Sequence, residues 1–271
     1  MTVLTATVMA DAAVDAERRF GGLRRLYGEE GYARLREASV AVVGLGGVGS
    51  WAVEALARSG LRQLVLIDFD HVAESNINRQ VQAVGTTIGM AKGEALRRRI
   101  ADIHPACIVR VVDDFASADN WPGLLPVPVD AVIDACDQGQ AKLAIAQWAR
   151  ARQVGLVCCG AAGGKQRAER IELADLADVT HDPLLAGLRQ RLRKAGAPRT
   201  GRIGVSCVFS REAVAAPAAS EGDACATSDG SLNCAGYGSS VAVTATAGFV
   251  AAGEVMRRIA AGDWRYTENA C

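Results

Sequence analysis

The sequence predicts an α/β fold: a doubly wound, Rossmann-like and mostly parallel sheet, with a C-terminal extension. Short Val-rich apolar runs alternate with amphipathic helical segments from residue 39 to residue 160. A glycine-rich turn joins the first of these runs to the next helical segment. Two of the runs end in an aspartate, Asp68 and Asp134. In open sheets of this kind, ligands bind at the carboxyl ends of the strands.

The expected elements follow one another in chain order. An amphipathic lead-in covers residues 16–38, and a buried strand follows it at 39–43. The glycine turn 44–49 opens a helix at 50–59, which Gly60 closes. Further strands are predicted at 64–68, 108–113, 131–134, 155–159 and 206–210, and further helices at 92–103 and 138–152.

After Gly160 the alternation weakens. Residues 175–202 are rich in charge and predict a mobile segment, and residues 213–231 predict a loop because Pro, Gly, Ala and Ser dominate them. The apolar run 239–253 is shorter than the ~20 residues that span a bilayer, so we expect a buried helix, with membrane association as the alternative. The predicted regions are therefore a helical lead-in (1–38), a nucleotide-binding core (39–160) and a C-terminal region (161–271).

The composition sets limits on the class of protein. The 271 residues are 50% hydrophobic and carry 30 basic and 30 acidic side chains, so an anionic partner must be held by a local patch. None of the eight cysteines forms a CxxC pair, and the chain is too long for a disulfide-stapled scaffold. The first twenty residues lack the basic start and apolar core of a secretory signal. We therefore expect a cytoplasmic protein with reduced thiols.

The glycine turn predicts a site for nucleotide phosphates. It contains Gly44, Gly46, Gly47 and Gly49 between a strand and a helix, where free backbone N–H groups face an anion. Asp68 follows Gly49 by 19 residues, the position of a carboxylate that binds ribose hydroxyls. These features alone fit both a dinucleotide and ATP.

Polar and cationic residues after this carboxylate favour ATP. Asp70, Asn76, Arg79 and Lys92 follow in order, and cations stabilise the charge that develops on phosphates during adenylyl transfer. Hydride transfer has no such requirement. Asp137, after the strand 131–134, is a candidate ligand for Mg²⁺, and its alternative role is to cap the next helix.

Four spaced motifs, GLGGVGS, IDFDHVAESNINRQ, GMAKGEA and VIDACDQ, resemble those of the ubiquitin-activating-like adenylyltransferases, which include the sulfur-carrier activating enzymes of thiamine and molybdopterin synthesis. The resemblance covers roughly residues 18 to 255. It implies that ATP and Mg²⁺ bind here. By this resemblance Gly46 and Gly47 border the phosphates and Asp68 binds the ribose. The triphosphate then contacts Asn76, Arg79 and Lys92, and the metal contacts Asp137.

Further motifs resemble the branch of this superfamily that dehydrates threonylcarbamoyladenosine in tRNA. They are RRFGGLRRLYGEEG, VVDDF, DLADVTHDPL, GVSCVFS and SLNCAGYGS. The resemblance implies adenylation of the threonyl carboxylate next to the anticodon, then cyclisation with loss of water. The alternative is adenylation of the C-terminal glycine of a sulfur-carrier protein, which the missing CxxC pairs of a structural zinc site disfavour. A nucleotide-binding scaffold and a nicotinamide-dependent oxidoreductase are further alternatives.

The resemblance also implies a homodimer, in which an arginine near the N-terminus reaches the partner's ATP. Arg25 is the first candidate and Arg19 the second, with a plain surface charge as the alternative. Relatives suggest a monovalent cation beside the site. Cys207 and Cys234 are expected to be structural thiols, and a sulfur-relay protein partner would make Cys234 the reactive one.

A basic run near residue 190 predicts contacts with the tRNA backbone. It has six cations and no acid between its first and last member: Arg189, Arg191, Arg193, Lys194, Arg199 and Arg202. Lys165, Arg167 and Arg170 are candidate additions. The alternative is a solvated charged helix.

Overall fold

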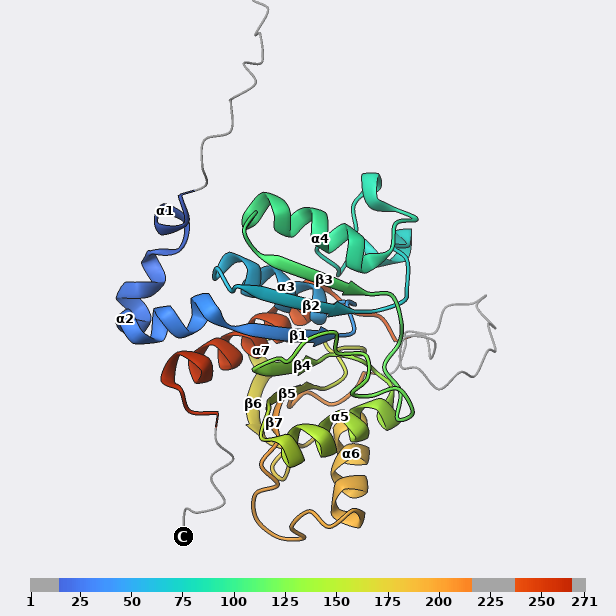
Figure 1. Ribbon diagram of the computed structural model, residues 1–271. Helices are drawn as coiled ribbons and strands as arrows, with labels where there is room; N and C mark the ends of the chain where they lie inside the picture. Colours follow the sequence, from blue (N-terminus) through green and yellow to red (C-terminus); the bar gives the residue numbers. More distant parts are fainter. Residues whose placement is uncertain (1–14, 216–236, 265–271) are drawn as a thin grey trace, which may run out of the picture.

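The computed structural model describes residues 15–215 and 237–264 and contains one seven-stranded sheet (Figure 1). The strand order is β3-β2-β1-β4-β5-β7-β6, and every neighbouring pair is parallel except β6 with β7. The strands are β1 (Ser39–Val43), β2 (Gln63–Ile67), β3 (Ile108–Val112), β4 (Ala131–Asp134), β5 (Gly155–Cys159), β6 (Ile171–Asp175) and β7 (Ser206–Ser210). The predicted fold class is confirmed.

Helices cover both faces of the sheet. They are α1 (Ala16–Phe20), α2 (Gly22–Glu37), α3 (Gly49–Arg58), α4 (Lys92–Ile103), α5 (Gly139–Arg152), α6 (Pro183–Lys194) and α7 (Val241–Ala261). Short 3-10 turns lie at Glu74–Asn76, Gly85–Thr87 and Ala168–Arg170. From residue 39 to residue 159, each predicted strand and helix is found with both ends within one residue of the prediction.

Alternation along the strands explains the two hydrophobic layers. In β1, Val40 and Val42 point into the layer that contains residues of α3, α4 and α7. Ala41 and Val43 point into the opposite layer with residues of α5 and α6. Because successive strand side chains face opposite sides, a strand covered on both faces needs an unbroken apolar run such as SVAVV.

The expectation of a mobile charged segment at 175–202 is wrong. The middle of the segment is the ordered helix α6, which Asp182 caps by accepting a hydrogen bond from the backbone N–H of Leu185, 2.9 Å away. Leu185, Leu188 and Leu192 recur at helical spacing and are buried against the sheet. This narrow apolar stripe was overlooked in the sequence because charged residues dominate the composition of the segment.

The apolar run near residue 240 forms the predicted buried helix, which continues to Ala261. This helix, α7, packs closely on α3. A Cβ on Gly248 would lie only 2.5 Å from the carbonyl oxygen of Val48. Among the helices of the described residues, we find none with the length and apolar character needed to cross a membrane.

The N-terminal and C-terminal regions hold different places around the sheet. Helices α1 and α2 lie at the amino ends of the parallel strands, on the left of Figure 1. Strands β6 and β7 continue the sheet that begins in the predicted core. Most of the predicted loop 213–231 lies outside the described residues.

Candidate active site

A cavity of about 660 Å³ opens at the carboxyl ends of β1, β2, β4 and β5. Most of the predicted site residues line it: Gly44, Gly46, Gly47, Asp68, Asp70, Asn76, Arg79, Lys92 and Asp137. The topology explains why these residues lie together. The strand order reverses between β1 and β4, so the loops that follow these two strands diverge and leave a crevice between them.

The glycine turn owes its shape to close backbone contacts. Gly44 has a φ of +84°, and a Cβ there would lie 2.9 Å from the backbone of Ala135. Gly49 does not line the cavity; a Cβ there would lie 1.8 Å from the carbonyl oxygen of Gly44, so its role is the tight turn itself. A Cβ on Gly46 would meet nothing within 4 Å, which leaves the backbone open to a ligand at the start of α3.

Asp68 and Lys92 form a charged group beside this turn. The carboxylate of Asp68 accepts hydrogen bonds from the backbone N–H groups of Leu45 (2.6 Å) and Asp70 (2.9 Å). Burial raises the pKa of Asp68, although Lys92 opposes this effect. The ammonium group of Lys92 lies 2.6 Å from Oδ2 of Asp70 and 3.8 Å from Oδ1 of Asp68, and the residue is only 6% exposed.

Arg79 and Asn76 also line the cavity. The guanidinium of Arg79 donates to the carbonyl oxygen of Ser75 and to Oδ1 of Asn78, and burial lowers its pKa. The carbonyl oxygen of Arg79 accepts hydrogen bonds from Trp51 and Thr244, on α3 and α7. Asn76 is buried, and its Oδ1 accepts from the backbone N–H of Ala73. The segment 73–79 is thus held by its own polar side chains.

Under Asp137 lies a buried ion pair. Lys142 Nζ lies 3.1 Å from Oδ1 of Asp134 and 3.2 Å from its carbonyl oxygen, and both side chains are fully buried. Asp137 itself is exposed and lines the cavity. Within residues 15–215 and 237–264, no group of three or more His, Cys, Asp or Glu side chains is arranged to hold a metal. A cation at Asp137 would therefore share its ligands with substrate phosphates, as Mg²⁺ often does.

Sequence reasoning missed several residues that support the site. Gln82 is buried and donates to the carbonyl oxygen of Leu45 in the glycine turn. Phe69 and Phe115, 55% and 54% exposed, meet edge to face at the cavity with ring centroids 5.6 Å apart. Thr244 lies in an apolar run that suggested only packing. No local pattern marks these residues, because each acts through a partner far away in the chain.

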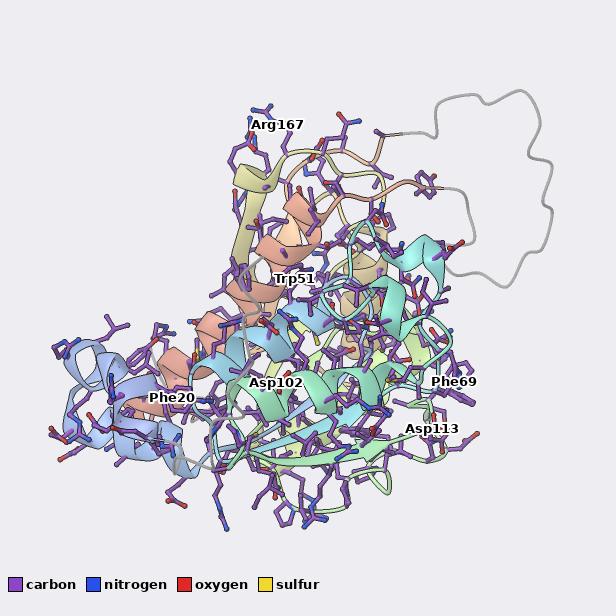
Figure 2. All side chains as sticks on the ribbon, turned by 90° about the horizontal axis from the view of Figure 1, so that it is seen from above. Phe20, Trp51, Phe69, Asp102, Asp113 and Arg167 are labelled. Carbon is purple, nitrogen blue, oxygen red and sulfur yellow. The ribbon has the colours of Figure 1, made fainter. Side chains whose placement is uncertain are left out.

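The candidate arginine fingers lie far from the cavity of their own chain. Arg25 is exposed on α2, at the amino ends of the strands, and makes no ion pair with the described residues. Arg19 donates to the carbonyl oxygens of Asp102 (3.2 Å) and Ile103 (2.7 Å), at the end of α4. Figure 2 shows Phe20 toward the left of the molecule, Asp102 near its middle and Phe69 at the right. Arg25 thus has no ion-pair partner among residues 15–215 and 237–264, whereas Arg19 serves a structural contact.

The basic run divides into engaged and exposed cations. Arg189 donates to the carbonyl oxygens of Leu176 and Val179, and the guanidinium of Arg191 packs on Gly139. Arg193 is half-buried. Lys194, Arg199 and Arg202 are exposed. An open depression of about 800 Å³ is lined by Arg189, Arg193, Lys194 and Arg199.

The three candidate additions to the basic run differ in their exposure. Lys165 is 2% exposed and donates to the carbonyl oxygens of His181 and Glu212, so it is not available to RNA. Arg167 and Arg170 are exposed, and Arg167 is among the residues labelled in Figure 2.

Burial raises the pKa of the Cys207 thiol well above its usual value, as expected of a structural thiol. Cys234 lies outside the described residues.

Known proteins resemble this chain over nearly its whole length. The tRNA threonylcarbamoyladenosine dehydratase of Escherichia coli (strain K12) is 44% identical over 253 residues, 90% of this chain and 94% of that protein. The enzyme of the same name from Haemophilus influenzae is 41% identical over 248 residues, again 90% and 94%. The crystal structure of the E. coli enzyme in complex with ATP matches with a TM-score of 0.81, 40% identity, and coverage of 93% and 98%. The ThiF family model matches residues 20–268, and the chain belongs to the ThiF family.

Proposed function

We propose that the protein uses ATP to adenylate the threonyl carboxylate of threonylcarbamoyladenosine, next to the anticodon of a tRNA, and then closes the ring with loss of water. The observation that carries this proposal is the match of 90% of the chain to two dehydratases that are at least 41% identical. The cavity supports it independently, because it combines a glycine turn with the buried Lys92 and the half-buried Arg79. A solved structure of the E. coli relative contains ATP and another contains AMP.

The residues of the cavity fit a nucleotide. Gly46 leaves the backbone open at the start of α3, where N–H groups favour phosphate. Asp68, at the end of β2, would bind the ribose, and Asn76, which lines the same cavity, would contact the triphosphate. ATP supplies the AMP group that turns a carboxylate oxygen into a leaving group.

Lys92 and Arg79 would stabilise the charge that builds on the phosphates. Lys92 is buried and Arg79 is partly buried. Ionic interactions are stronger in such surroundings than at the water-exposed surface. Lys92 is held by Asp70 and Asp68, so it is ordered before substrate binds. Asp137 would hold Mg²⁺ against the phosphates, and a monovalent cation is a further expectation from relatives. Ring closure then needs the nucleophile of the same nucleoside held close to the carbonyl.

The exposed cations at the end of α6 and just after it would supply a surface for the tRNA backbone. Lys194, Arg199 and Arg202 face solvent, and Leu184 in the first turn of the same helix lines the cavity. A 12-residue helix is about 18 Å long, so α6 joins the cavity to these cations over the reach of a few nucleotides. Each phosphate contact would add to affinity and to its dependence on salt.

A homodimer would bring Arg25 to a partner's cavity, because α2 lies at the opposite end of the sheet from its own. Mixing Arg25→Ala and Lys92→Ala proteins tests this arrangement. Random exchange of subunits makes half of the dimers mixed, each with one intact site, which would restore about a quarter of the wild-type activity. No recovery on mixing, with exchange shown by mass, would refute the role of Arg25.

The activity itself is tested by nucleoside mass. The protein is incubated with ATP, Mg²⁺ and tRNA that carries threonylcarbamoyladenosine, and the tRNA is digested to nucleosides. We expect an ATP-dependent loss of one water from that nucleoside. An unchanged mass, together with pyrophosphate exchange triggered by a sulfur-carrier protein, would instead establish the alternative substrate.

A further inference from the structure

Asp182 joins two walls of the cavity through one carboxylate. Its Oδ1 accepts from the backbone N–H of Leu185 and caps α6, and its Oδ2 accepts from the backbone N–H of Ala161, 2.8 Å away. Asp182 is 3% exposed. Ala161 and Leu184 both line the cavity, so this carboxylate sets the position of a loop wall and of a helix wall together.

Close packing at Gly160 shows how tightly this contact is fitted. A Cβ on Gly160 would lie 2.0 Å from Oδ2 of Asp182, so only glycine leaves room for the carboxylate. Lys165 secures the same loop from its other end, because its ammonium group donates to the carbonyl oxygens of His181 and Glu212. The wall formed by residues 160–163 is therefore held at both ends by buried charged side chains.

This wall faces the half of the cavity that lies away from the carboxylate of Asp68. Asp68 follows β2, on one side of β1, whereas Gly160 follows β5, two strands to the other side of β1. Neighbouring strands are about 4.8 Å apart, so the wall lies about 10 Å from the glycine turn along the sheet. A nucleotide with its ribose at Asp68 and its phosphates at the turn leaves that half for the carboxylate substrate.

We propose that Asp182 is a positioning residue that shapes the acyl-substrate half of the cavity and leaves the nucleotide half unchanged. This inference rests on the proposed function for the identity of the substrate. Loss of the contact with Ala161 frees the wall, and displacements of about 1 Å in such walls cost up to ~100-fold in productive binding.

The variant that tests it is Asp182→Asn. Asparagine is a good helix cap, so the contact with Leu185 is retained. Its single side-chain oxygen cannot also accept from Ala161, which then faces an amide N–H₂. The matched control is Asp175→Asn, because Asp175 also accepts hydrogen bonds from loop N–H groups, those of Ala177, Ile203 and Gly204. None of these three loop residues lines the cavity.

We expect Asp182→Asn to raise the KM for tRNA at least ~10-fold and to leave the KM for ATP within about twofold. Asp175→Asn is expected to lower Tm about as much as Asp182→Asn does, but to leave both the KM for tRNA and the KM for ATP unchanged. Gly160→Ala, which pushes the same wall from the other side, is expected to reproduce the change in KM for tRNA. Equal KM values for tRNA in wild type and Asp182→Asn would overturn the proposal.

Amide hydrogen exchange tests the role of the Asp182–Ala161 contact without any measurement of tRNA turnover. In Asp182→Asn, exchange in peptide 160–164 is expected to rise at least ~10-fold, while peptide 44–49 is unchanged. Unchanged exchange at 160–164 would refute the contact's role even if the protein acts on another substrate. Failure of the proposed function would appear separately, as a wild-type protein that removes no water from the nucleoside.

Discussion

The ammonium group of Lys142 lies 3.1 Å from the carboxylate of Asp134, with both side chains completely buried beneath the loop that carries Asp137. Burial alone would lower the pKa of Lys142, but the carboxylate of Asp134 outweighs it and raises that pKa. The carboxylate of Asp134 also accepts hydrogen bonds from the thiols of Cys136 and Cys158. A charge pair at this depth makes the loop sensitive to the loss of either partner.

Replacing Lys142 by Met is expected to lower the free energy of unfolding by about 3–5 kcal/mol, because the Asp134 charge would stay buried without a partner. Urea denaturation measures this change. The double variant Asp134→Asn, Lys142→Met removes both charges and is expected to recover part of the loss. A single variant as stable as the wild type would show that the pair contributes nothing.

Lys92→Ala is expected to lower kcat for the dehydration about 100-fold or more, as loss of one charge-stabilising donor does elsewhere. Steady-state release of pyrophosphate measures it. Arg97→Ala is the control, because Arg97 lies on the same helix α4 and pairs with Glu94 on the surface. Full turnover by Lys92→Ala would exclude a role for this lysine, whichever carboxylate is the substrate.

Gly47→Ala is expected to weaken ATP binding through the glycine turn. The new Cβ would lie 2.9 Å from Cγ2 of Thr244 and would push the turn away from α7. Thr244→Ser removes that methyl group, so the double variant is expected to regain most of the affinity in calorimetric titration with ATP. If Thr244→Ser brings no recovery, the contact with α7 does not set the shape of the turn.

Substituting both Lys194 and Arg199 by Ala is expected to raise the KM for tRNA and to reduce its salt dependence. Removing two phosphate contacts lowers the slope of log affinity against log salt by about 1.4 to 2. The control is Arg62→Ala, an exposed cation at the amino end of β2, opposite the cavity. Equal slopes in the double variant and the control would place the tRNA elsewhere.

Glu54 is expected to stabilise the fold in a pH-dependent way. Burial alone would raise the pKa of Glu54, but hydrogen bonds from Arg99 and Arg58 outweigh it and hold that pKa below its usual 4.5. The folded state therefore binds fewer protons than the unfolded state in this range. The stabilisation is present above pH 4.5 and is lost as the pH falls through the lowered pKa.

Glu54→Gln is therefore expected to cost about 1.5–3 kcal/mol at pH 7, and progressively less below pH 4.5. Denaturant titrations at several pH values measure the difference. Glu172→Gln, at the exposed pair with Arg211, is expected to cost less than about 1 kcal/mol throughout. A Glu54→Gln cost that does not change with pH would contradict the assigned role of its charge.

The sequence by itself determined the unit from β1 through the glycine turn to α3, the approximate ends of every strand except β6, and the gathering of Asp68, Arg79 and Lys92 at one sheet edge. These features depend on local periodicity and on the rule that parallel strands place their carboxyl ends together. The same local reasoning predicted the limits of β4, α5 and β5.

The tertiary structure alone decided which polar side chains are buried and what they contact. Lys142, Lys165 and Asp182 look like surface charges in the sequence, yet each bonds to a partner that only the packed fold brings near. The helix α6 was missed for the same reason, since burial of its leucines depends on the sheet beneath them. Such contacts join residues distant in the chain, and no pattern within one segment carries that information.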